Sequence, residues 1–134
     1  LVNAGEFDIL IENNKYIWNL TNEDWITRQD SHYTIGCIHT AQGYDMNYVG
    51  VIFGEEIDYN FETNSIEINL KKYMDKKVKA GTDETVLKKL IINTYTTILT
   101  RGIKGCYVYA CNPNLHKYLK KYISTANDIS LERK

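Results

Sequence analysis

The sequence contains no Gly-Lys dipeptide, so it cannot carry the GxxxxGK[ST] loop that binds the phosphates of ATP. Its eight glycines never lie two positions apart, which also excludes the GxGxxG loop of dinucleotide-binding proteins. The HExxH pair of zinc proteases is missing, and the three histidines are scattered along the chain. These absences exclude a self-contained nucleotide enzyme and give no indication of a local metal site.

Cysteines and long apolar runs are scarce as well. Three cysteines without CxxC spacing predict neither a disulfide framework nor a zinc ribbon, and they indicate an intracellular, cytoplasmic protein. The longest uncharged apolar stretches, such as residues 48–54 and 90–100, are shorter than the ~20 residues that a membrane helix needs. No secretion signal opens the chain, and residues 1–6 look cut from a longer protein.

What is present predicts one folded domain. The 134 residues are 43% hydrophobic and 25% charged, which is too apolar for a disordered tail. The net charge of -1 conceals an asymmetry: residues 1–70 hold two basic and twelve acidic side chains (-10), whereas residues 71–134 hold fourteen and five (+9). Such a division indicates either a face that binds a polyanion or pairing between the two halves.

The order of elements predicts an α/β fold. Short apolar runs across Asn13-Asn14 predict a hairpin, and runs around residues 62–64 predict a second one. Continuous apolar runs are typical of strands that are buried on both faces of a parallel sheet. Strands are expected at 34–38, 48–53 and 105–111, and a solvated basic segment at 71–79. One helix is expected to begin within 81–84, where a capping residue is followed by acids, and to end near Arg101, and another is expected at 113–125. The prediction is therefore a mostly parallel sheet flanked by helices, with added hairpins.

Two stretches resemble motifs of a known family. Residues 37–54 (CIHTAQGYDMNYVGVIFG) resemble motif V of superfamily 1 helicases, especially the Schlafen-type, group 3-like, DNA/RNA helicase domain of bacteria. Residues 93–110 (NTYTTILTRGIKGCYVYA) resemble motif VI of that family, in the family's order. The resemblance implies that residues 1–134 are a single domain, the second RecA-like lobe of a helicase, or part of it.

The resemblance also implies a site. Arg101 would be the catalytic arginine of motif VI, Gly43 and Asp45 would face the nucleotide with it, and His39, Thr40 and Gln42 would touch the nucleic-acid backbone. ATP and Mg²⁺ would be shared with a first lobe, which carries the phosphate loop and precedes this chain. The family usually has Glu, an aromatic residue and Asp where this chain has Asp45, Met46 and Asn47, and its motif IV is unrecognisable here.

Without the resemblance, the same residues predict ordinary structure. Thr40 to Gly43 follows an expected strand, where free backbone N–H groups can hold a phosphate, but a plain turn is the simpler interpretation. In that interpretation Thr40 caps a helix, Gly43 supplies backbone freedom, and Asp45 is a solvated acid. Arg101 would then satisfy carbonyls at the end of its helix.

Three functions follow from these patterns. The first is a lobe of an ATP-dependent DNA/RNA helicase or translocase, inactive alone. The second is a non-enzymatic nucleic-acid-binding α/β module that presents the lysines of 71–79 and 117–121 to DNA or RNA. The third is a small thiol enzyme, because Cys37 and His39 would share one face of the expected strand 34–38.

Overall fold

The structure is a computed structural model that describes residues 7–21 and 24–125. The chain divides into two compact units, Leu1–Asp45 and Met46–Lys134, and each is described by itself. Residues 1–6, predicted to be the cut end of a longer protein, lie outside the described residues. That residues 1–134 form a single domain stays a prediction.

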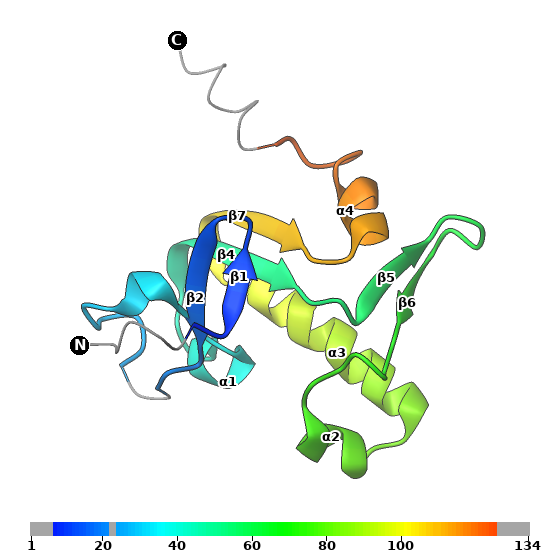
Figure 1. The fold of residues 1–134 in the computed structure, drawn as a ribbon, viewed down its shortest axis with the longest axis horizontal. Helices are drawn as coiled ribbons and strands as arrows, with labels where there is room; N and C mark the ends of the chain where they lie inside the picture. The colour runs from blue at the N-terminus through cyan, green and yellow to red at the C-terminus, as the bar shows by residue number, and fades with distance from the viewer. Residues whose placement is uncertain (1–6, 22–23, 126–134) are drawn as a thin grey trace. The chain divides into compact units, whose positions relative to one another are not determined.

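The first unit is built on a three-stranded sheet with the order β1-β2-β3, of which Figure 1 labels β1 and β2. Strands β1 (Ile9–Ile11) and β2 (Asn14–Trp18) form the predicted hairpin, and β3 (Thr34–Ile35) joins β2 in parallel. The turn lies one residue earlier than predicted, since Ile11 pairs with Asn14 and Glu12 takes the positive φ of 53°. A short 3₁₀ helix, η1 (Ser31–Tyr33), precedes β3, and helix α1 (Ile38–Ala41) follows it.

The second unit contains two further sheets. Strands β4 (Met46–Phe53) and β7 (Gly102–Ala110) pair in parallel, while β5 (Ile57–Asn60) and β6 (Ser65–Ile68) form the second predicted hairpin. Helices α2 (Lys76–Ala80), α3 (Glu84–Leu99) and α4 (Pro113–Leu119) complete the unit. The predicted α/β class is confirmed, with parallel pairs and added hairpins.

Two helices begin in the segments that were predicted to start them, and each has a capping side chain. Asp83 accepts hydrogen bonds from the backbone N–H groups of Thr85 (2.9 Å) and Val86 (3.3 Å) and starts α3. Asn112 does the same for Asn114 and Leu115, and Pro113 takes the first position of α4.

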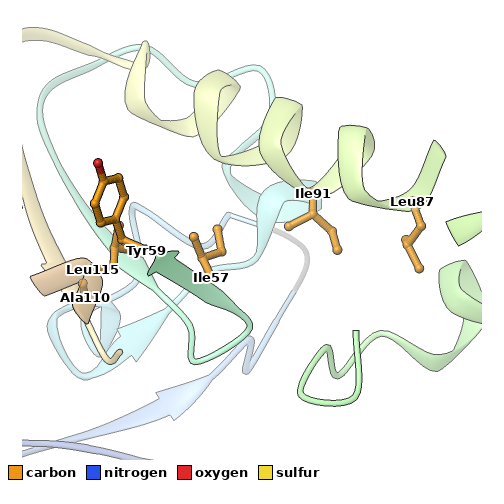
Figure 2. Packing of buried hydrophobic residues seen from close by; sticks show 6 residues of the cluster. All are labelled: Ile57, Tyr59, Leu87, Ile91, Ala110 and Leu115. Atoms are coloured by element: carbon orange, nitrogen blue, oxygen red, sulfur yellow. The ribbon is translucent and has the colours of Figure 1, made fainter. Parts of the chain in front are cut away.

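The core of the second unit joins four elements. Leu87 and Ile91 of α3 are its most deeply buried side chains, at 1% and 2% exposed. Figure 2 shows them with the other buried members of this cluster: Ile57, Tyr59, Ala110 and Leu115. The spacing of apolar residues in α3 places Val86 and Leu90 on the same face as Leu87 and Ile91. Val86 and Leu90 nevertheless remain 49% and 44% exposed, so the part of this face that packs into the core is narrow.

Three predictions about this unit are wrong. Strand β4 is not buried on both faces in the described chain: Val49 and Val51 are buried, but Tyr48 is 55% exposed. The last helix ends at Leu119 rather than near residue 125, and the following residues form turns. A helix over 113–125 would place Tyr122 on the same apolar face as Leu115, but Tyr122 is 73% exposed, and Tyr118 packs against the core instead.

The basic segment 71–79 is partly built into the fold. Residues from Lys76 onward form α2, which was not predicted, and Val78 packs against the core. Lys72 forms an ion pair with Glu55 at 2.8 Å, and Lys79 donates to the carbonyl of Leu70 at 2.8 Å. Lys72 and Lys79 therefore have partners within the unit.

Candidate functional site

The segment that resembles motif V folds as a tight turn. Strand β3 ends at Ile35, and Cys37 is extended and immediately precedes α1. A Cβ on Gly36 would lie 2.7 Å from Thr40 Oγ1 and 2.9 Å from the ring of Trp25, so only glycine fits where the chain turns. The predicted strand 34–38 is therefore wrong beyond Ile35.

This turn removes the basis of the thiol-enzyme hypothesis. His39 lies in α1 and Cys37 precedes it, so the two do not share a strand face. The sulfur of Cys37 receives a weak hydrogen bond from the Thr40 hydroxyl at 3.8 Å. Burial raises the pKa of the Cys106 and Cys111 thiols, which disfavours the reactive thiolate at both positions.

Thr40 is committed to the turn itself. Its side chain is 3% exposed, and its hydroxyl donates to the carbonyl of Cys37 at 2.9 Å. The simpler interpretation predicted that Thr40 caps a helix. That prediction is wrong, because Thr40 is the third residue of α1. The backbone N–H groups of Thr40, Ala41 and Gln42 donate to carbonyls of the same turn at 3.2, 3.0 and 2.9 Å, so these three are not free to hold a phosphate.

The neighbouring site residues face solvent. His39, Gln42, Gly43 and Asp45 are all exposed. Gly43 has φ of +90°, which a residue with a side chain adopts only under strain. The need for backbone freedom at Gly43 is thereby confirmed, and the space around it is open.

Arg101 occupies the junction between α3 and β7. Its backbone N–H donates to the carbonyl of Ile98, and its side chain is half-buried. Gly102 then starts β7, and a Cβ there would collide with the carbonyl oxygen of Gly105. Gly102 stands just beyond the expected end of the helix, where a glycine commonly takes the left-handed conformation. It is required instead by this close approach of the backbone, since Gly43 is the glycine with a positive φ in the described chain.

The two motif-like stretches meet along a parallel pair of strands. Strand β4 lies within residues 37–54 and β7 within residues 93–110, and they pair from Met46 with Gly102 to Phe53 with Ala110. At the start of both strands, the N–H of Met46 donates to the carbonyl of Arg101 at 3.0 Å. Asp45 directly precedes β4, and Arg101 directly precedes β7. The first residues of these two strands, Met46 and Gly102, are paired. His39, Thr40, Gln42 and Gly43 lie in the first unit, and Arg101 lies in the second.

A partly buried hydrogen-bond network ties α3 to the end of β4. The Tyr95 hydroxyl donates to Glu56 Oε1 at 2.7 Å and accepts from the N–H of Gly54 at 3.1 Å. Burial, and then the hydrogen bond to Glu56, raise the pKa of Tyr95 well above its ordinary value. The network holds the helix that leads to Arg101. Sequence reasoning missed it, because nothing in the pattern links Tyr95 with Glu56.

A second group of side chains lies at and after α4, and the sequence analysis singled out only its lysines, as part of 117–121. Lys117 and Lys121 both approach the ring of Phe61, and Tyr118 stacks on Tyr59. The one signal available was the spacing of four between the two lysines, which places them on one helix face.

Metal and membrane sites have no support in the described chain. Between residues 7 and 125, apart from 22–23, no cluster of three or more His, Cys, Asp or Glu side chains could hold a metal ion. Within the same residues, no helix has the length and apolarity that crossing a bilayer requires.

Comparison with known proteins gives two findings. The family model described as Schlafen group 3, DNA/RNA helicase domain, matches residues 2–112. An uncharacterized protein of Saccharomyces cerevisiae is 38% identical over 100 residues, which cover 71% of this chain and 22% of that protein. The chain thus spans about a fifth of the length of this relative. No solved structure matches the present chain.

Proposed function

This chain belongs to the Schlafen group 3 DNA/RNA helicase domain family, and we propose that it supplies the second RecA-like lobe of an ATP-driven superfamily 1 helicase or translocase. The observation that carries the proposal is the parallel pairing of β4 with β7, which starts where Met46 donates to the carbonyl of Arg101. It places the residues that follow the motif V-like turn beside those that follow the motif VI-like arginine. A bacterial origin and a cytoplasmic location stay predictions.

In this proposal Arg101 acts as the arginine finger of the interlobe ATP site. Its guanidinium would stabilise charge on the transferred γ-phosphoryl group. The support lies in how firmly its backbone is held. The hydrogen bond to Met46, the glycine-only contact after it and the Tyr95 network on α3 all restrict the junction from which the side chain extends.

The motif V-like turn would serve both ligands. Gly43 and Asp45, which are exposed, would face the nucleotide. His39 and Gln42, also exposed, would contact the nucleic-acid backbone. A direct contact by Thr40 requires its buried hydroxyl to leave Cys37, so its support for this role is weaker than that of its neighbours.

ATP and Mg²⁺ would be held mainly by the first lobe, the proposed partner of this chain in the same protein. The described residues supply no cluster of metal ligands, and the sequence has no phosphate-binding loop. The part of this chain is to position one arginine and one exposed turn. DNA or RNA would be the other partner.

The test uses the full-length protein that carries this chain. Arg101→Ala should lower ATP turnover in the presence of single-stranded nucleic acid by about 10³-fold or more, the contribution typical of an arginine finger. Arg101→Lys should recover little, because an ammonium cannot reproduce the planar fork of a guanidinium. Circular dichroism and binding of a fluorescent ATP analogue should remain close to those of the unmodified protein.

Lys104→Gln provides a matched control, because it removes one positive charge from an exposed position three residues away. A fall in turnover of less than about threefold on Arg101→Ala, well below the finger effect, would return Arg101 to a helix-end cation. A full-length protein that binds nucleic acid but never hydrolyses ATP would favour the alternative, a non-enzymatic binding module.

A further inference from the structure

A compact group of basic and aromatic side chains lies outside both motif-like stretches. Its members come from the loop after β5, from α4 and from the turn that follows α4: Phe61, Lys117, Tyr118, Lys121 and Tyr122. We call this group the aromatic-lysine patch. Figure 1 shows the elements concerned, the β5–β6 hairpin and α4.

Two ammonium groups of the patch share one aromatic ring. Lys117 Nζ lies 5.4 Å and Lys121 Nζ 4.9 Å from the centroid of Phe61, both within the range of a cation–π contact. Neither lysine of the patch forms an ion pair with a carboxylate of the described residues.

The tyrosine rings make successive contacts from the core to solvent, of which the inner contact is stacked and the outer one is tilted. Tyr59, which is 7% exposed, stacks on Tyr118 with a centroid distance of 3.7 Å and an interplanar angle of 17°. Tyr118 contacts Tyr122 at 5.1 Å, and Tyr122 is 73% exposed. The outermost ring, that of Tyr122, thus contacts Tyr118 and is otherwise largely exposed to solvent.

Packing explains only part of this arrangement. Tyr59 and Tyr118 belong to the core, but Tyr122 buries little of its ring. Two ammonium groups that approach the same ring repel each other, so this arrangement costs stability in the absence of a bound anion. Lys120, also exposed, adds a third positive charge, while Glu62 on the adjacent loop supplies one negative charge. The surface therefore retains a net positive charge beside an exposed ring.

We propose that the aromatic-lysine patch contacts single-stranded nucleic acid, with Lys117 and Lys121 at a backbone phosphate and Tyr122 stacked on a base. A phosphate relieves the repulsion between the two ammonium groups, and base stacking on an aromatic side chain needs no particular sequence. The inference rests on the proposed function and adds a contact surface beyond the one expected at residues 39–42.

Fluorescence anisotropy of the full-length protein tests the charged part. The probes are labelled oligothymidylate and oligouridylate of about 20 nucleotides, longer than the ~4–16 nucleotides that a single-strand-binding domain covers. Lys117→Gln/Lys121→Gln should weaken binding at least about tenfold at low salt. It should also reduce the slope of log K against log salt by about 0.7, since the two lysines share one phosphate and each phosphate contact on a single strand contributes ~0.7. Lys89→Gln/Lys104→Gln changes the net charge equally at other exposed positions and should leave both quantities nearly unchanged.

The aromatic part has its own variants. Tyr122→Ala should weaken binding by about 5- to 150-fold, the loss typical of one base stack, without changing the salt slope. Tyr122→Phe keeps the ring and should bind nearly as well as the unmodified protein. Tyr33→Ala, at a tyrosine that is 49% exposed in the first unit, is the matched control.

The outcomes separate the two proposals. If the unmodified protein binds neither probe, both the proposed function and the patch are wrong. If it binds, and the patch variants behave like their controls while remaining folded by circular dichroism, the patch alone is wrong. A third result would also overturn the patch proposal: polyglutamate binds in a way that depends on both lysines, while nucleic-acid binding is unchanged by Tyr122→Ala. That result would indicate an acidic protein partner.

Discussion

Gly102 shows how one hydrogen atom in place of a methyl group sets the start of β7. Because a Cβ at this position would collide with the carbonyl oxygen of Gly105, Gly102→Ala should destabilise the protein by about 1–3 kcal/mol, the usual cost of overpacking. Gly50→Ala is the control on the paired strand, where a Cβ meets nothing within 4 Å. It should be neutral or stabilising by up to about 1 kcal/mol, because alanine restricts the unfolded chain. Urea denaturation of both variants measures the difference.

Tyr95 should make stability depend on pH in the alkaline range. Its pKa is raised in the folded protein, first by burial and then by the hydrogen bond to Glu56. A raised folded-state pKa gives stability that is full below the unfolded value of about 10 and is lost as the pH rises above it. The free energy of unfolding should therefore fall by up to about 1.4 kcal/mol per pH unit beyond pH ~10.

Tyr95→Phe should remove this part of the alkaline loss while costing about 1–3 kcal/mol at neutral pH, because Glu56 and the N–H of Gly54 lose their partner. Urea denaturation between neutral pH and pH ~11 compares the two proteins, so that the titration of other groups cancels. If the free energy of unfolding fell equally with pH in the variant and in the unmodified protein, Tyr95 would not be the cause of the alkaline loss of stability.

At the scale of elements, α3 depends on its first residue. Asp83 accepts two backbone hydrogen bonds from an exposed position, so Asp83→Ala should cost about 0.5–2 kcal/mol without creating a cavity. Asp83→Asn keeps an accepting oxygen and should recover most of that loss. Chemical denaturation of the two variants separates the cap from the charge, and equal stabilities for Ala and Asn would contradict the capping role.

Elements with strong local signals were predicted from the sequence. Both hairpins, the capped starts of α3 and α4, and strands β4 and β7 follow from turn residues, capping residues and apolar runs. Helix α2 was missed because its lysines give it no apolar face, and Val78 is the member that packs against the core. The end of β3 was missed because it depends on the side chains of Trp25 and Thr40 around Gly36, which no local pattern reports.

The candidate site also contains some features that could be predicted from the sequence and others that could not. Gly43 could be predicted because glycine at a turn signals a positive φ, which the structure shows. The burial of Thr40 could not, because it results from the carbonyl of Cys37 turning toward its hydroxyl. The pairing of Met46 with Gly102 joins two distant segments, and sequence alone suggested it only through the order of the two motif-like stretches.

For the whole molecule, the isolated 134-residue chain should hydrolyse no ATP above background. It has no phosphate-binding loop, and its described residues offer no cluster of metal ligands. A phosphate-release assay checks this, with Arg101→Ala as a control for contaminating enzymes. Steady turnover that disappears with Arg101→Ala would show a complete active site within the chain and would contradict the lobe proposal.

The pairing of β4 with β7 also decides the order in which this chain can fold. It joins residue 46 to residue 102 and so closes a long loop that contains a hairpin and two helices. Long-range contacts of this kind form slowly, whereas the two hairpins and α3 need only local ones. During synthesis on the ribosome, β4 is complete long before β7 exists. Until then it presents unpaired backbone groups and the apolar residues Val49 and Val51, so the nascent chain is most prone to aggregation just before its motif VI-like segment emerges.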